Sequence, residues 1–141
     1  MWGKNKKRKA SDDNEEDENK TTMKQLSLLL GSSGLNNSIS INFNHIYFNN
    51  DITSDTAFEL NKELRKVQIT IKTISASLNI EPEPIYLHLT TDGGLIYSAF
   101  SVIDCIKSLS VPVHTIIDGF VASAGTLISL AGEKRHNHYV R

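Results

Sequence analysis

Cysteine, proline and tryptophan are scarce in this sequence of 141 residues, which holds one, three and one of them respectively. The single cysteine, Cys105, cannot form an internal disulfide, so the fold does not depend on an oxidising compartment. A formal net charge of −1 gives no argument for a nucleic-acid partner, because phosphate binding needs a clustered basic surface. No run of about 18 uninterrupted apolar residues occurs, so we expect no membrane span and a cytoplasmic location.

Charge is segregated at the N-terminus, where the basic cluster KNKKRK at 4–9 precedes an acidic block at 12–18. Such a polar segment buries too little surface to offset its ordering entropy. We therefore expect residues 1–37 to be a disordered charged tail and linker, and residues 38–141 to form the folded domain. The basic cluster on its own is also typical of a nuclear-localisation or nucleic-acid patch, which the acidic block would partly neutralise.

Hydrophobic periodicity predicts alternating strands and helices after the linker. Apolar and polar residues alternate over 38–48, as in a strand. A capping candidate at Thr53 or Ser54 precedes apolar residues at helical spacing, which predicts a long helix over 53–75. Further on, the pattern predicts a strand over 85–90, a helix over 95–109, a strand over 111–117 and a helix over 123–130. This order is typical of an α/β fold with a parallel sheet and crossover helices.

Two of the predicted strand ends carry turns rich in small residues. The first is TDGG, where Gly93 and Gly94 permit backbone conformations closed to other residues and leave an amide exposed. The second is VASAG, which places Ser123 where a strand gives way to a helix, so that free amides and the helix dipole point at its hydroxyl. Each turn alone is common, but their pairing across one crossover favours a serine beside an oxyanion hole.

Residues 45–141 resemble the ClpP-type serine peptidases of the Clp/crotonase fold, through the TDGG turn, the VASAG turn and the ungapped spacing between them. The resemblance implies repeated ββα units, with Ser123 as the nucleophile. It implies the backbone amides of Gly94 and Ala124 as oxyanion donors.

The same resemblance gives Gly93 and Gly125 the role of shaping the two turns. The sequence departs from the family pattern at two positions: Asp92 stands where proline is usual, and Ala124 stands where methionine is usual. The second change keeps the backbone amide. Both changes point away from the bacterial norm, toward viral or organellar relatives.

For the whole protein, the resemblance implies the proteolytic subunit of an ATP-dependent Clp protease, a serine endopeptidase. It implies a homo-oligomeric ring of stacked heptamers, unfolded polypeptides as substrates and an AAA+ unfoldase as partner. No cofactor or metal is expected in this chain, because the unfoldase would use the ATP. No nucleic-acid or membrane partner is expected.

A serine nucleophile needs a base, and the sequence offers five histidines. His88 and His114 fall within predicted strands and are interpreted as structural, whereas His136 and His138 fall in a polar loop too close behind Ser123 to return to it. His45 is the fifth. In the resembling family the histidine lies on the following strand and the aspartate later still. We therefore expect the chain to be a fragment, truncated at the C-terminus, or a divergent subunit without its base.

Alternative hypotheses remain open for the function. One is a non-catalytic ClpP-like subunit, and another is a crotonase-type acyl-CoA enzyme, which uses paired amides but needs no serine there. An SppA-like peptidase is a lesser variant. Ser123 within ASAG favours a peptidase over a crotonase. Cys105, by contrast, is predicted to be a core residue of the 95–109 helix rather than a nucleophile.

Overall fold

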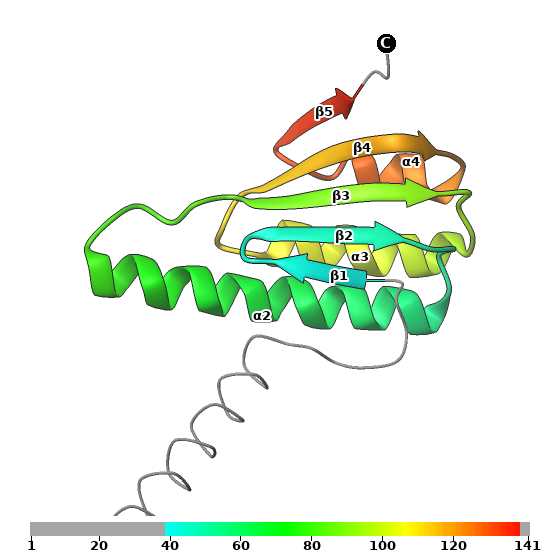
Figure 1. Ribbon diagram of the computed structural model, residues 1–141. Helices are drawn as coiled ribbons and strands as arrows, with labels where there is room; N and C mark the ends of the chain where they lie inside the picture. Colours follow the sequence, from blue (N-terminus) through cyan, green and yellow to red (C-terminus); the bar gives the residue numbers. More distant parts are fainter. Residues whose placement is uncertain (1–38, 139–141) are drawn as a thin grey trace, which may run out of the picture. The chain divides into compact units, whose positions relative to one another are not determined.

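The computed structural model describes residues 39–138 and places them in one compact unit, Asn36–Arg141. A five-stranded sheet has the order β1-β2-β3-β4-β5, in which β1 is antiparallel to β2 and every other pair is parallel. Figure 1 shows these elements, which are β1 (Ile39–Asn42), β2 (His45–Asn49), α2 (Ser54–Leu78), β3 (Ile85–Thr91), α3 (Ile96–Ser108), β4 (Val113–Val121), α4 (Ala124–Ser129) and β5 (Lys134–His138). The predicted α/β class is confirmed.

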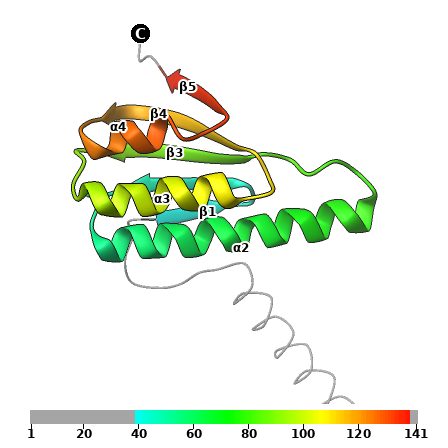
Figure 2. The same cartoon turned by 180° about the vertical axis from the view of Figure 1, so that it is seen from behind.

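Helices α3 and α4 cover one face of the sheet. They lie behind the strands in Figure 1 and in front of them in Figure 2, and α2 runs alongside α3. The strand residues that face the helices alternate with residues on the other face, so that β3 reads buried and half-buried in strict succession. The core comprises Ile46, Phe48, Leu60, Leu64, Ile85, Leu87, Leu89, Val102 and Ile128, among others. The opposite face of the sheet carries no helix in the described range and is called here the open face.

Helix α2 begins where its local sequence predicts. Thr53 is the N-cap, its hydroxyl accepts a hydrogen bond from the Thr56 amide, and the Thr56 hydroxyl accepts one from the Thr53 amide. This reciprocal capping box satisfies two amides that the first turn leaves free. Asn79 ends the helix in the left-handed conformation, so the helix runs three residues further than the predicted end at Ser75.

Two parts of the secondary-structure prediction are wrong. The single strand over 38–48 is a hairpin, β1 and β2, with Phe43 at φ 54° in its turn. The polar loop that was expected to hold His136 and His138 is strand β5, which pairs in parallel with β4. Its sequence KRHNH has no apolar residue, and residues 134–137 are exposed, as is typical of a strand at the edge of a sheet.

Burial fits the prediction for Cys105, whose side chain is buried in α3 and whose pKa is raised by that burial. No helix within residues 39–138 is long and apolar enough to cross a membrane. The predicted tail and linker, 1–37, lies outside the described residues and stays a prediction.

Candidate active site

Backbone segments that follow β2, β3 and β4 meet at the carboxyl ends of these parallel strands. The Ile52 amide, just after β2, donates to the Gly93 carbonyl at 2.7 Å, and the Leu95 amide donates to the Ile52 carbonyl at 2.8 Å. The Ala122 amide, just after β4, donates to the Thr91 carbonyl at 3.0 Å. These bonds fix the turn after β3 against its neighbours on both sides. Parallel α/β sheets place their functional sites at this edge.

Ser123 stands between β4 and α4 in an unusual backbone conformation. Its φ is 49° and its ψ is −126°, in the region that residues with a side chain rarely adopt. The side chain is exposed and forms no capping hydrogen bond with α4. A hydroxyl that caps nothing and is held on a strained turn is free to act on a ligand.

Gly93 lies directly against Ser123. A Cβ atom built on Gly93 would come within 2.7 Å of the Ser123 Cβ, 3.0 Å of the Ala122 carbonyl oxygen and 3.3 Å of the Ala124 amide nitrogen. Gly93 also has φ 107°, which favours glycine. The two turns that the sequence singled out are therefore in contact, although 30 residues separate Gly93 from Ser123.

The amides of Gly94 and Ala124 are both without a backbone acceptor within the described range. Gly94 sits in a strand-like bridge to Ile52 in which the flanking Gly93 carbonyl and Leu95 amide make the bonds. Its own amide therefore points away from Ile52. Ala124 is the first residue of α4 and its amide is one that a helix start leaves free. Because α4 has only six residues, these individual amides matter more than a helix dipole.

Gly125 and Thr91 hold the second turn close to β3. A Cβ on Gly125 would lie 2.4 Å from the Thr91 side-chain methyl, so this glycine is required by close packing and not by its own backbone angle. The Thr91 hydroxyl accepts a hydrogen bond from the Gly93 amide at 3.1 Å. Thr91 and Ile52 thus organise the site, and the sequence carried no signal for either except their places at strand ends.

The described histidines lie away from Ser123. His114 is next to the start of β4, whereas Ser123 follows its end, and His136 is paired with Ile116 in the middle of the sheet. His88 uses both ring nitrogens elsewhere, Nδ1 with Asp118 and Nε2 with His45. His138 is paired with Asp118 through the backbone of β5. No imidazole with a described side chain is in place to take the Ser123 proton.

The open face holds a cluster of rings that the sequence analysis did not foresee. His45 stacks on Tyr86 with ring centroids 4.8 Å apart, and Tyr47 stacks on His88 at 4.3 Å. Burial first, and the neighbouring His88 second, lower the pKa of His45. The only available signal was the alternation of His and Tyr along β2 and β3, which matters only once the strands are paired.

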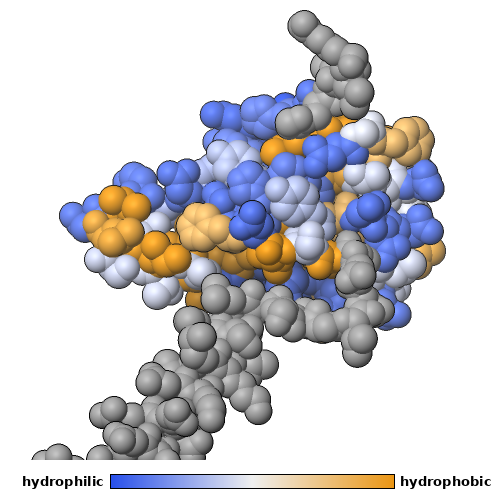
Figure 3. Space-filling model, viewed as in Figure 1, coloured by the Kyte–Doolittle hydropathy of each residue, from blue (hydrophilic) through white to orange (hydrophobic). Residues whose placement is uncertain are grey.

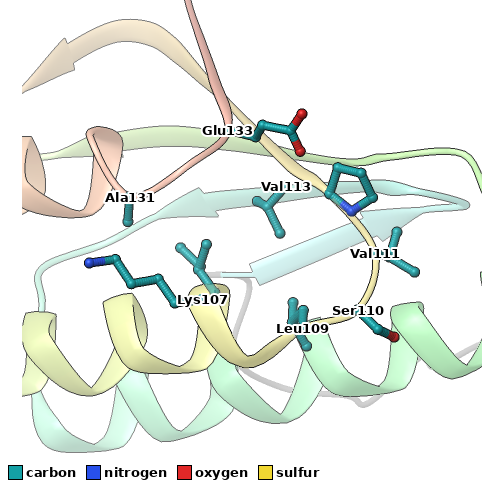
Figure 4. Close-up of a pocket in the computed structure, with 9 residues that line it drawn as sticks. Lys107, Leu109, Ser110, Val111, Val113, Ala131 and Glu133 are labelled. Carbon is teal, nitrogen blue, oxygen red and sulfur yellow. The ribbon is translucent and has the colours of Figure 1, made fainter.

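A hollow of about 300 Å³ lies at the opposite, amino ends of the parallel strands, between the end of α3 and the start of β4 (Figure 4). Six of its nine lining residues have apolar side chains, and the other three are Lys107, Ser110 and Glu133. It includes none of the predicted site residues. Within residues 39–138, no group of three or more His, Cys, Asp or Glu side chains is arranged to hold a metal ion.

Known proteins are similar to this chain over most of its described residues. The family model described as Clp protease matches residues 41–140. ATP-dependent Clp protease proteolytic subunit 2 of Treponema denticola is 34% identical over 90 residues, which cover 60% of this chain and 44% of that protein. Subunit 1 of Chlamydia muridarum is 32% identical over 85 residues, covering 60% of this chain and 40% of that protein. The chain spans less than half the length of these curated relatives.

Solved structures show the same fold. ClpP1 from Listeria monocytogenes has a TM-score of 0.52 at 24% identity, over 64% of this chain and 48% of that one. The ClpP catalytic domain from Plasmodium falciparum has a TM-score of 0.51 at 24% identity, also over 64% and 48%. The expected Clp/crotonase fold is therefore confirmed, and because the family model covers 100 of the 141 residues, the chain belongs to the Clp protease family.

Proposed function

We propose that this chain carries the nucleophile and oxyanion hole of a serine endopeptidase, with Ser123 as the nucleophile. The observation that supports this most directly is the contact of Gly93 with Ser123, which brings the two small-residue turns together. The Gly94 and Ala124 amides are the oxyanion donors, and each is worth about 3 kcal/mol of transition-state stabilisation. Gly93 and Gly125 are the residues that allow the turns to approach.

The chemistry follows from these roles. The Ser123 Oγ attacks a peptide carbonyl carbon, its proton passes to a base, and the carbonyl electron pair moves to the oxygen. The two amides then donate hydrogen bonds to that oxyanion. Collapse breaks the C–N bond, the leaving amine takes the proton from the base, and water releases the acyl group by the reverse route. None of these steps needs a cofactor.

The base and its orienting carboxylate come from outside the described set of side chains. His88 is committed to Asp118 and His45, and His114 lies toward the other edge of the sheet. This chain by itself should therefore hydrolyse peptides slowly or not at all. In the complete enzyme we place it in a homo-oligomeric ring of stacked heptamers, in the cytoplasm, that degrades unfolded polypeptides delivered by an ATP-consuming AAA+ unfoldase.

The test is covalent labelling of Ser123 with a fluorophosphonate. The chain should react slowly. A chimera that appends the part of the Treponema denticola subunit following the matched region should react rapidly, because it supplies the base. Ser123→Ala should abolish labelling of the chimera, whereas Ser77→Ala, which removes an exposed serine on α2, should not. A chimera that forms rings but leaves Ser123 unlabelled would contradict the proposal.

The non-catalytic alternative keeps one supporting observation, namely the absence of a described imidazole beside Ser123. The two readings differ in the chimera. A structural subunit would assemble into rings without reacting, and a peptidase would assemble and react. Equal, rapid labelling of the chain and the chimera would place the base within these 141 residues and direct attention to His136 and His138.

A further inference from the structure

Three side chains on the open face form a continuous chain of hydrogen bonds across three strands. His45 of β2 meets His88 of β3 through Nδ1 and Nε2 at 2.9 Å. His88 then meets Asp118 of β4 through Nδ1 and Oδ2 at 2.6 Å. Each imidazole also stacks on a tyrosine ring, His45 on Tyr86 and His88 on Tyr47. We call the three residues His45, His88 and Asp118 the relay.

The proton count of the relay is limited. A carboxylate accepts only, so His88 Nδ1 donates to Asp118, and its Nε2 then accepts from His45 Nδ1. One added proton, bound at His45 Nε2, lets the His45 Nδ1 proton pass to His88 Nε2, so that His88 donates on both sides and His45 accepts through Nδ1. A second proton places N–H against N–H between the two imidazoles. The relay therefore keeps both hydrogen bonds with one added proton and loses the His45–His88 bond with two.

Asp118 is the first residue of the segment 118–123, which ends at Ser123. Its carbonyl accepts a hydrogen bond from the Thr90 hydroxyl, so Asp118 is attached to β3 through both its side chain and its backbone. Directly after it, Gly119 turns to φ 87° and β4 slips out of regular pairing with β3. Pairing resumes at Val121, two residues before the turn at Ser123. We call residues 118–123 the β4 bulge.

The surroundings of the relay are mixed in charge. In Figure 3, which shows the molecule from the side of the open face, hydrophilic residues are interspersed with apolar ones. The other titratable or charged residues on the strands packed around the relay are Tyr47, Tyr86, His114, Lys134, Arg135, His136 and His138, the last of which is the register partner of Asp118, and Glu133 lies just before β5. Burial first, and the charge of Lys134 second, lower the pKa of His114.

We propose that His45 and His88 are positioning residues for Ser123, because the relay anchors the β4 bulge, and that a second proton on the relay loosens this anchor. The consequence for catalysis rests on the proposed role of Ser123. The pKa of His45 is lowered by burial and then by His88, which supports the proposal because it means that a charge on His45 beside His88 is disfavoured. The site would thus be ordered at neutral pH and loosened in acid.

Amide hydrogen exchange of this chain tests the proposal without any catalytic readout. The protection factor of the Ala122 amide, which bonds the Thr91 carbonyl, reports on the β4 bulge. Protection factors correct for the intrinsic effect of pH on exchange. From about pH 7.5 to about pH 5, Ala122 should lose about tenfold of its protection, while core amides of β3 such as Leu87 should not change.

Three matched His→Phe variants separate the roles of His88, His45 and His114, because phenylalanine keeps each ring stack and removes the hydrogen bonds. His88→Phe should lower the protection of Ala122 at both pH values, because Asp118 loses its side-chain attachment to β3 and keeps only the bond from the Thr90 hydroxyl. His45→Phe should keep Ala122 protected at both, because no second imidazole then faces His88 and its bond to Asp118 remains. His114→Phe, on the same face and outside the relay, should leave the wild-type response to pH unchanged.

Equal loss of protection at Ala122 and Leu87 would reduce the relay to a general stabiliser of the fold and overturn the proposal. A wild-type response that survives in His45→Phe would overturn it as well. Neither result depends on whether Ser123 reacts with a fluorophosphonate. Failure of the proposed peptidase function would therefore leave the exchange data readable, and the reverse also holds.

Discussion

The strand-end site and the open face of the same sheet are built in opposite ways. Around Ser123, the contacts are made by backbone and by residues with little or no side chain, such as Gly93, whose absent Cβ leaves room for the Ser123 Cβ. On the open face, the contacts are made by the side chains of His45, His88 and Asp118. The strand-end site depends on the absence of side-chain atoms at its glycines, and the open face depends on polar side chains that bond to one another.

This difference predicts how each region responds to mutation. Adding a single methyl group to the strand-end site should be severe, above all at Gly94, where the three nearest atoms are backbone atoms of Ile52 and cannot move aside. Removing a polar group from the open face should be mild, because the relay is half-buried and water can replace a lost partner. The following substitutions test this contrast, in order of decreasing effect.

Gly94→Ala should have the largest effect on stability. A Cβ at this position would lie 2.2 Å from the Ile52 carbonyl oxygen, and the backbone φ is 144°. We expect a loss of about 3 kcal/mol or more in the free energy of unfolding, measured by urea denaturation. Gly119→Ala is the matched control, since its φ is 87° but nothing lies within 4 Å, so it should lose only about 1 kcal/mol. Equal losses would mean that backbone angle alone matters.

Thr91→Val should come next. The Thr91 side chain is buried and its hydroxyl accepts the Gly93 amide, so valine leaves that amide without a partner inside the protein. The expected loss is about 1–2 kcal/mol by urea denaturation. Thr73→Val, on the exposed side of α2, should change stability by less than about 0.5 kcal/mol. A Thr91 variant as stable as the Thr73 variant would show that water satisfies Gly93.

The sequence predicted features of the strand-end site better than those of the open face. The capping threonine of α2 acts on near neighbours in the chain, and the small residues around Ser123 form a compact local motif, so the sequence indicated both features. The hairpin was missed because Phe43 continued the apolar alternation through the turn, although its side chain is exposed. The relay was missed because its members are 43 and 30 positions apart, and only the register of the strands brings them together.

Ser123→Gly should raise stability by about 1 kcal/mol. Relief of the positive φ, worth about 1–3 kcal/mol, exceeds the extra flexibility that glycine gives the unfolded chain. Ser123→Ala keeps a Cβ and should not gain. Thermal unfolding of the two variants measures the difference. If both variants have the stability of the wild type, then Ser123 stores no strain and its turn is no different in kind from an ordinary loop.

The pH dependence of stability should show the smallest effect and should come from the open face. The pKa of His45 is lowered in the folded state, by burial and then by His88, so below the ordinary histidine pKa the unfolded chain binds more protons than the folded one. Stability from this group is therefore full above about pH 6.5 and is lost as the pH falls through the folded pKa.

Urea denaturation between about pH 7.5 and about pH 5 measures the slope of the free energy of unfolding against pH. His45→Phe should flatten this slope, whereas Thr73→Val, an exposed change on α2 away from the open face, should leave it unchanged. A slope unchanged by His45→Phe would assign the acid sensitivity to other groups, of which His114, with its pKa lowered by burial and Lys134, is the first to replace.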